Sequence, residues 1–203
     1  MSYLVLIRHG ESEWNAKGLW TGLTDVSLSE KGKEQAKTAG DKIKKINFDF
    51  SFSSNLKRAN ETLEIIKQTI NQNNLPTINN SALNERDYGE FTGKNKWEIK
   101  EKIGDEEFLK IRRSWDHPIK NGESLKNVYD RVVPYYLENI LPKLKEEKNI
   151  LIAAHGNSLR ALIKRLENIS DEQIPHLEIS TGEVYIYNIG KNGEIISKEI
   201  KKV

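Results

Sequence analysis

Short apolar runs alternate with stretches of helical periodicity in the first third of the chain. Residues 3–7 are apolar without interruption and stop at Arg8, which predicts a buried strand. Residues 36–46 carry apolar side chains at spacings of three, four and three, which predicts a helix with one buried face. The same order recurs when Phe occupies alternate positions over 48–52 and helical spacing returns over 56–70. A repeated strand and helix indicate an α/β fold with a parallel sheet.

Two serines precede the first of these helices. Ser27 and Ser29 both suit the N-cap position, because a serine oxygen can accept a free backbone N–H of the first turn. Ser27 is followed three residues later by Glu30, which fits the capping-box pattern. We therefore expect the helix to begin close to these residues.

The middle of the chain has weaker patterns. Residues 77–122 are polar and punctuated by glycine, and they predict only short helices near 94–103 and 105–113. A longer helix follows from Leu125. Pro134 should bend or break it, because proline has no backbone N–H and its ring crowds the preceding turn.

The last part of the chain returns to clear strand and helix signals. Residues 150–154 are a second uninterrupted apolar run, and helical spacing follows over 159–166. Two further strands are predicted at 184–189 and 195–200. An Asn-Gly dipeptide lies between them and is typical of a hairpin turn.

Composition excludes several classes of protein. The 203 residues include no cysteine, which rules out disulfides, thiolate zinc sites, iron–sulfur clusters and a cysteine nucleophile. The 32 basic and 30 acidic side chains nearly balance, so no net field would attract nucleic acid or anionic membranes. The first apolar run is too short for a secretory signal or a membrane span, and we expect a cytoplasmic protein. Length and the lack of a linker predict one domain over residues 1–203.

Two of the four histidines occupy matching positions. His9 and His155 each follow an apolar strand and precede a glycine. The carboxyl ends of parallel strands meet at one edge of a sheet, so the two rings should converge if their strands are neighbours. Either histidine alone is typical of a hydrogen-bonded loop residue. The pair, with Arg8 beside one and Asn157 beside the other, favours a functional site.

Two arginines should reach the same edge. Arg8 and Arg58 each follow a predicted strand, Arg58 at the start of a helix. A single arginine in such a place usually faces solvent or forms an ion pair. Two arginines that converge with two histidines indicate a phosphate pocket instead, because a guanidinium binds phosphate oxygens in pairs.

An ordered set of motifs now points to one family. Residues 6–15, Leu-Ile-Arg-His-Gly-Glu-Ser-Glu-Trp-Asn, resemble the Arg-His-Gly signature of the histidine phosphatase superfamily, and residues 153–160 resemble its second histidine motif. Residues 83–89, Asn95-Lys96 and Arg112-Arg113 are similar to cofactor-dependent phosphoglycerate mutases. The resemblance covers nearly the whole chain. It implies a three-layer α/β/α fold of the phosphoglycerate mutase type, with a mostly parallel sheet flanked by helices.

The resemblance implies catalytic roles for five residues. His9 would carry the phosphoryl group on a ring whose pKa lies near neutrality. His155, Arg8 and Arg58 would stabilise that group during transfer, and Glu85 would exchange the proton of the substrate hydroxyl. It also implies a substrate-binding set: Arg8, Asn15, Thr21, Gly22, Arg58, Glu85, Tyr88, Lys96, Arg112, Arg113, Gly156 and Asn157.

Glu85 has two alternative interpretations. It could form an ion pair with the adjacent Arg86, or it could join His9 and His155 as a metal ligand. The surrounding motif argues against the ion pair, and the nearby arginines would repel a metal cation. We therefore expect no metal, and the resemblance implies 2,3-bisphosphoglycerate as the cofactor that primes His9.

The implied activity is the interconversion of 3-phosphoglycerate and 2-phosphoglycerate, in glycolysis and gluconeogenesis. The partners would be small phosphoglycerates, with neither nucleic acid nor membrane, and monomer or homo-oligomer stays open. Two alternatives are a phosphomonoesterase of the same superfamily and a non-catalytic module that binds phosphoryl groups. Residues 114–124 form a shorter segment than in the longer family members, which leaves the closure of the site open.

Overall fold

A six-stranded sheet forms the centre of the computed structural model, which describes residues 1–203, and its strand order is β3-β2-β4-β1-β5-β6. β1, β2, β3 and β4 run parallel, whereas β5 and β6 are antiparallel to their neighbours. The mostly parallel sheet predicted from the sequence is therefore confirmed. The strands are β1 (Ser2–Arg8), β2 (Phe50–Ser53), β3 (Thr77–Asn79), β4 (Ile150–Ala154), β5 (Val184–Ile189) and β6 (Ile195–Lys201).

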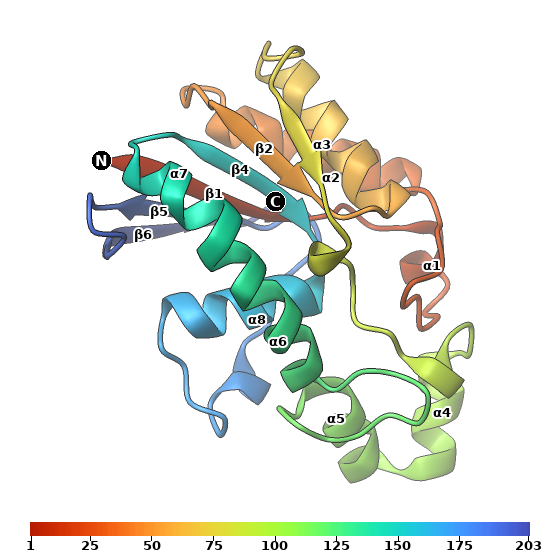
Figure 1. The fold of residues 1–203 in the computed structure, drawn as a ribbon. Helices are drawn as coiled ribbons and strands as arrows, with labels where there is room; N and C mark the ends of the chain where they lie inside the picture. Colours follow the sequence, from red (N-terminus) through yellow and green to blue (C-terminus); the bar gives the residue numbers. More distant parts are fainter.

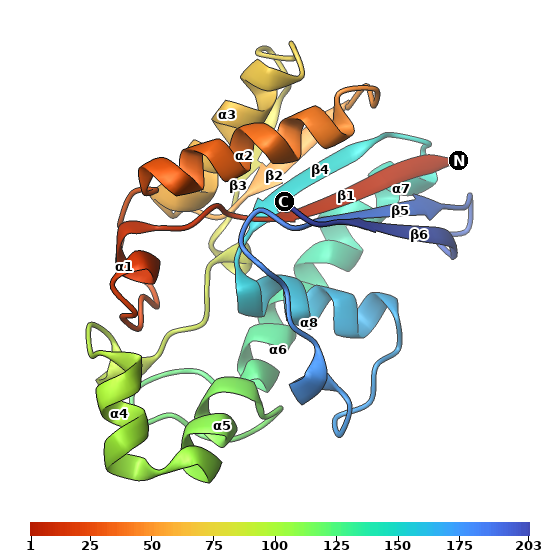
Figure 2. The same cartoon turned by 180° about the vertical axis from the view of Figure 1, so that it is seen from behind.

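Helices cover both faces of this sheet and complete a three-layer α/β/α arrangement (Figures 1 and 2). One layer contains α2 (Glu30–Ile43) and α3 (Lys57–Thr69). The opposite layer contains α6 (Leu125–Tyr135), α7 (Leu141–Lys145) and α8 (Gly156–Leu166). None of the helices is long and apolar enough to cross a membrane.

The side chains of β1 show how the sheet joins the two layers. Leu4 and Leu6 belong to the core on the side of α6 and α8, whereas Val5 and Ile7 belong to the core on the side of α2 and α3. Alternate residues of a strand point to opposite faces, and all four of these side chains are fully buried. An uninterrupted apolar run is thus explained by a strand that is covered on both faces.

Smaller elements gather beyond the carboxyl ends of β1 and β4. They are α1 (Glu13–Ala16), α4 (Lys96–Ile103) and α5 (Asp105–Arg113), on the right and at the bottom of Figure 1. Trp20, Phe108, Ile111 and Ile119 form a separate small core that holds this part together. Three short 3₁₀ turns complete the fold, at Ser81–Leu83, Gly89–Phe91 and Ile174–His176.

The N-cap of α2 differs from the capping box expected at Ser27. Ser29 is the N-cap, and its Oγ accepts the backbone N–H of Gly32 at 3.1 Å. Ser27 is held in an extended segment, where its carbonyl accepts the N–H of Glu13 and the next residue pairs with Ser12. Long-range pairing with the loop after β1 therefore decides between the two serines.

Pro134 lies inside α6, and the predicted disturbance follows it directly. A π-helical turn, Tyr136–Ile140, connects α6 to α7. Pro134 and Pro142 flank this turn, and neither has an N–H to continue the regular pattern. β3 was not predicted, because it is only three residues long and its side chains are exposed at the edge of the sheet.

Candidate active site

The sheet topology brings His9 and His155 to one edge. β1 and β4 are hydrogen-bonded neighbours, and Arg8 is paired in register with Ala154. The residue after each strand is a histidine, and the N–H of His9 donates to the carbonyl of Ala154 at 2.9 Å. The two imidazole rings lie edge to face with centroids 5.0 Å apart.

His9 is held as a neutral ring with one nitrogen available. Its Nδ1 lies 2.6 Å from the carbonyl oxygen of Gly10, which only accepts, so Nδ1 carries the proton and Nε2 has a free lone pair. Burial lowers the pKa of His9 well below its usual value, and the positive charges of Arg58 and Arg8 lower it further. The sequence-based expectation of a pKa near neutrality is therefore wrong, because it did not account for full burial beside two guanidinium groups.

His155 is also buried and has one unpartnered nitrogen. Its Nε2 lies 2.7 Å from Oγ of Ser54, while Nδ1 is buried without a hydrogen-bond partner. The N–H of Leu56 donates to the same Ser54 Oγ, so this hydroxyl links the His155 ring to the start of α3. Burial lowers the pKa of His155 well below its usual value, and electrostatic interactions with Arg58, His9 and Arg8 lower it further.

Arg8 and Arg58 are fixed by carbonyl oxygens, with no carboxylate as an ion-pair partner. Arg8 Nη1 donates to the carbonyl of Ile179 at 2.6 Å. Arg58 donates to the carbonyls of Thr24 and Gly22 at 3.0 and 2.9 Å. Burial lowers the pKa of both side chains. Both positive charges are thus oriented but not neutralised, which suits a bound anion.

Glu85 points toward the second histidine motif and away from Arg86. Its Oε1 accepts the backbone N–H of Arg86 at 2.8 Å and that of Asn157 at 3.1 Å. The guanidinium of Arg86 instead donates to the carbonyl of Ile111 and lies over the ring of Tyr88. The alternative ion pair between Glu85 and Arg86 does not form. Two backbone donors hold the Glu85 carboxylate at the edge of the site.

One pocket is lined by nearly all of the predicted site residues. All the predicted catalytic and substrate-binding residues line it except His155, which is buried beside His9. The lining residues are Arg8, His9, Asn15, Trp20, Thr21, Gly22, Arg58, Glu85, Tyr88, Lys96, Arg112, Arg113, Gly156, Asn157, Arg160, Glu178 and Ile179.

This pocket has a large surplus of positive charge. Six arginine and lysine side chains line it, against two carboxylates. Only Arg113 has a carboxylate partner, Glu178. Burial lowers the pKa of Lys96 to about 8, and the charges of Arg112 and Arg8 contribute to that shift. An anion with several negative charges is the ligand that such a pocket fits. No group of three His, Asp or Glu side chains is arranged to hold a metal ion.

Four lining residues were not predicted. Arg160 lies one helical turn after Asn157, within the second histidine motif, and this position was the available signal. It is buried, and it donates to Asn157 Oδ1 and to the carbonyls of Arg113 and Ile174. Trp20, Glu178 and Ile179 lie on loops without a pattern that marks them.

The family model of the histidine phosphatase superfamily (branch 1) matches residues 4–199. The chain belongs to the histidine phosphatase superfamily. The 2,3-bisphosphoglycerate-dependent phosphoglycerate mutase of Parvibaculum lavamentivorans is 46% identical over 97% of this chain and 95% of its own length. The phosphoglycerate mutase of Schizosaccharomyces pombe is 46% identical over 97% of this chain and 94% of its own length. The family predicted from the motifs is confirmed.

Solved histidine phosphatase structures share the fold. A mycobacterial glucosyl-3-phosphoglycerate phosphatase in complex with VO3 has a TM-score of 0.84 at 22% identity, over 100% of this chain and 99% of that one. The alpha-ribazole phosphatase from Shigella flexneri has a TM-score of 0.78 at 27% identity, over 93% and 91% of the two chains. The α/β fold class predicted from the sequence agrees with these structures.

Proposed function

We propose that this chain interconverts 3-phosphoglycerate and 2-phosphoglycerate with His9 as the phosphoryl carrier, in glycolysis and gluconeogenesis. The single observation that carries the proposal is the state of His9. A neutral ring has its Nδ1 bound to a carbonyl and its Nε2 free, beside the unneutralised charges of Arg8 and Arg58. Phosphoglycerate mutases 46% identical to this chain over nearly its full length support the substrate assignment.

His9 acts as the nucleophile in this proposal. Its Nε2 attacks phosphorus, a P–N bond forms, and the P–O bond to the glycerate oxygen breaks. Low basicity keeps the ring unprotonated at neutral pH, so the lone pair is available without prior loss of a proton. The hydrogen bond from Nδ1 to Gly10 fixes the plane of the ring and stabilises the positive charge that develops on it.

Positive charge and N–H donors stabilise the phosphoryl group during transfer. Arg8 and Arg58 provide guanidinium groups whose free N–H donors match phosphoryl oxygens. The amide of Asn157 and the backbone at Gly156, the first residue of α8, add donors at a helix N-terminus. His155 adds a buried ring beside that of His9, and its Nδ1 has no hydrogen-bond partner in the protein.

Glu85 moves the proton. When His9 accepts the phosphoryl group, the carboxyl of Glu85 gives its proton to the departing glycerate oxygen. When the phosphoryl group returns, the carboxylate takes the proton of the attacking hydroxyl. Its other oxygen, Oε2, lies near Gly156: a Cβ added to that glycine would be 3.7 Å from Oε2. Fixed backbone donors on Oε1 keep this carboxylate in one orientation.

The pocket fits 2,3-bisphosphoglycerate as a cofactor. Six cationic side chains suit two phosphates and a carboxylate, and the buried Nε of Arg8, Oγ1 of Thr21 and Nδ1 of His155 lack partners within the protein. When bound, 2,3-bisphosphoglycerate supplies the phosphoryl group that primes His9. Lys96, Arg112 and Arg113 would retain the glycerate portion, and Asn15, Thr21, Gly22 and Tyr88 would close the pocket around it. No metal is part of this proposal.

We also propose that residues 1–203 act as one catalytic domain, since the pocket draws residues from β1, α3, α4, α5 and α8. A phosphomonoesterase needs to hold only phosphate and to admit water. Four cations beyond the phosphate-binding pair favour a substrate with a further anionic group.

Primer dependence tests the proposal. Enzyme freed of phosphoryl groups is mixed with 3-phosphoglycerate, with and without 2,3-bisphosphoglycerate, while 2-phosphoglycerate and free phosphate are measured in the same sample. We expect rapid isomerisation only with the primer, and none with His9→Gln. Isomerisation that ignores the primer would contradict the proposal. Faster release of phosphate would identify a phosphomonoesterase, and phosphate binding without phosphohistidine would identify a binding module.

A further inference from the structure

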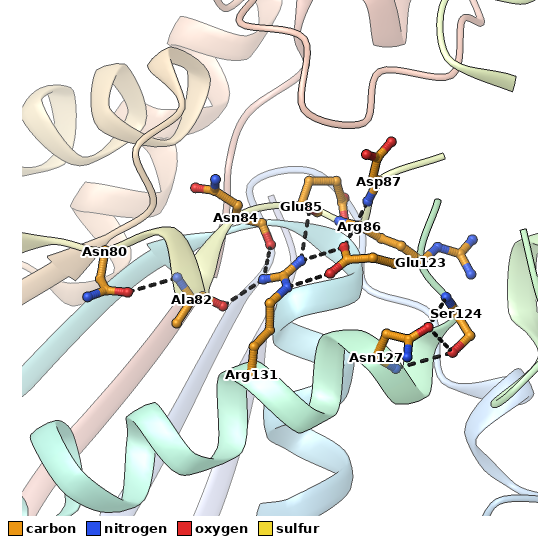
Figure 3. A network of polar contacts seen from close by, with 10 residues as sticks. All are labelled: Asn80, Ala82, Asn84, Glu85, Arg86, Asp87, Glu123, Ser124, Asn127 and Arg131. Atoms are coloured by element: carbon orange, nitrogen blue, oxygen red, sulfur yellow. Dashed lines mark hydrogen bonds and ion pairs between the residues drawn. The ribbon is translucent and has the colours of Figure 1, made fainter. Parts of the chain in front are cut away.

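Arg131 on α6 makes an unusually complete set of hydrogen bonds just outside the pocket (Figure 3). Its Nε and Nη2 donate to the two oxygens of Glu123 at 2.8 and 2.9 Å. Its Nη1 donates to the carbonyls of Ala82 and Asn84 at 2.7 and 3.0 Å, and its Nη2 donates to the carbonyl of Glu85 at 3.0 Å. All five N–H groups of the guanidinium are thus used.

Glu123 extends this contact to the other side of Glu85. Its Oε2 accepts the backbone N–H of Asp87 at 2.9 Å, and its own N–H donates to the carbonyl of Asp87 at 2.9 Å. Burial raises the pKa of Glu123, but hydrogen bonds from Arg131 and from the N–H of Asp87 outweigh burial and leave it lowered. The carboxylate therefore stays charged and keeps its bidentate contact with Arg131.

Arg131 and Glu123 together hold the backbone on both sides of Glu85. In Figure 3 the Arg131 side chain rises from α6 to the segment that contains Asn84 and Glu85, and Glu123 meets it from the loop that precedes α6. The segment between Leu83 and Gly89 has no helix or strand of its own, so these bonds replace those of regular structure. Neither residue lines the pocket, and neither reaches the carboxylate of Glu85.

We propose that Arg131 and Glu123 are positioning residues for Glu85, and that they set where its carboxylate stands relative to the reacting oxygen. This inference rests on the proposed role of Glu85 as the proton carrier. A carboxylate that exchanges a proton with a substrate hydroxyl must lie within hydrogen-bond distance of it, and a misplacement of about 1 Å costs roughly 100-fold in rate. Lysine cannot replace Arg131. A guanidinium has five N–H donors in one plane, which serve the carboxylate of Glu123 and three carbonyls, whereas an ammonium has three donors and no planar pair.

Arg131→Lys should reduce the rate of phosphoryl transfer by about 10- to 100-fold. Because the cations that line the pocket stay in place, the inhibition constant for inorganic phosphate should change less than twofold. The rate is measured in a single turnover, as the loss of label from phosphohistidine enzyme after mixing with 3-phosphoglycerate. Lys126→Met is the matched control, since Lys126 lies on the same helix in an exposed pair with Asp130, and it should leave the rate unchanged.

A double-mutant cycle with Glu85→Gln distinguishes positioning from general damage. If Arg131 acts through Glu85, Arg131→Lys lowers the rate in the wild-type background and adds nothing when Glu85 is already Gln. Losses that multiply would overturn the proposal, as would equal losses of phosphate binding and transfer. Should Arg131→Lys fail to fold, Glu123→Gln weakens the same contact and is read in the same cycle.

The outcome also separates this inference from the proposed function. If wild-type enzyme takes no label from 2,3-bisphosphoglycerate, the proposed function is wrong. The same cycle then uses steady-state release of phosphate from 3-phosphoglycerate, a reaction that still requires a proton for the leaving oxygen. Non-additive losses in that reaction support the positioning role, and additive losses reject it.

Discussion

Acid should destabilise this protein through two particular histidines. His9 and His155 are both almost fully buried, and burial beside Arg58 and Arg8 lowers both pKa values well below the ordinary 6.5. In the unfolded chain the same side chains take up protons as the pH falls through about 6.5. The unfolded state then binds more protons than the folded state, so the free energy of unfolding decreases with falling pH. The loss begins near pH 6.5 and continues down to the folded-state pKa values.

The size of the effect follows from the unfolded-state pKa alone while both rings stay neutral in the folded protein. Between about pH 7.5 and 5.5, each histidine lowers the free energy of unfolding by about 1.4 kcal/mol, so the pair contributes up to about 2.7 kcal/mol. With a urea m-value of about 2.5 kcal/mol per molar, this difference in the free energy of unfolding lowers the urea midpoint by about 1 M. His176 is exposed, so its replacement serves as a control.

Urea unfolding followed by circular dichroism at the two pH values measures this difference. The buffers must lack phosphate and sulfate, because an anion bound to the folded state would stabilise it by mass action. His9→Gln should retain about half of the pH dependence, and His176→Gln should retain all of it. A wild-type change below about 1 kcal/mol, or a full pH dependence in His9→Gln, would refute the reasoning.

Three further predictions concern Gly32, Lys96 and Arg160. Gly32→Ala should destabilise the fold by about 3 kcal/mol or more in urea unfolding, because its Cβ would lie 2.0 Å from the carbonyl oxygen of Glu11, and backbone cannot move aside as a side chain can. The KM for 3-phosphoglycerate should rise by about fivefold from pH 8 to 9 as Lys96, with a pKa of about 8, loses its charge, and Lys96→Met should show a high KM without that rise. Arg160→Met should raise the KM by about tenfold with a smaller change in kcat, because the amide of Asn157 loses the partner that orients it.

The local pattern of the sequence was sufficient to predict the centre of the fold. Two uninterrupted apolar runs, each followed closely by His-Gly, predicted two buried strands whose histidines would converge if the strands were neighbours, and β1 and β4 are indeed parallel neighbours. The resemblance named most of the residues that line the pocket, all but Trp20, Arg160, Glu178 and Ile179.

Features that depend on distant contacts were not predictable in this way. The choice of Ser29 as N-cap follows from pairing of the preceding segment with the loop after β1. The lowered pKa of His9 follows from burial beside Arg58, whose side chain comes from another layer. Arg131 resembles any arginine on the polar part of a helix until the loop that it holds is known.

The position of β4 has a consequence for how the molecule is made. β4 lies between β1 and β2, although β1 ends at Arg8 and β2 at Ser53, far before β4 begins at Ile150. A nascent chain that has emerged only through α6 therefore contains β1 and β2 but not the strand that lies between them. Each of these strands then has unpaired backbone N–H and C=O groups, which can pair with other chains. β4 fills this gap and pairs with both strands. We infer that the first two-thirds of the polypeptide needs protection from aggregation during synthesis, and that maturation waits for a single late insertion.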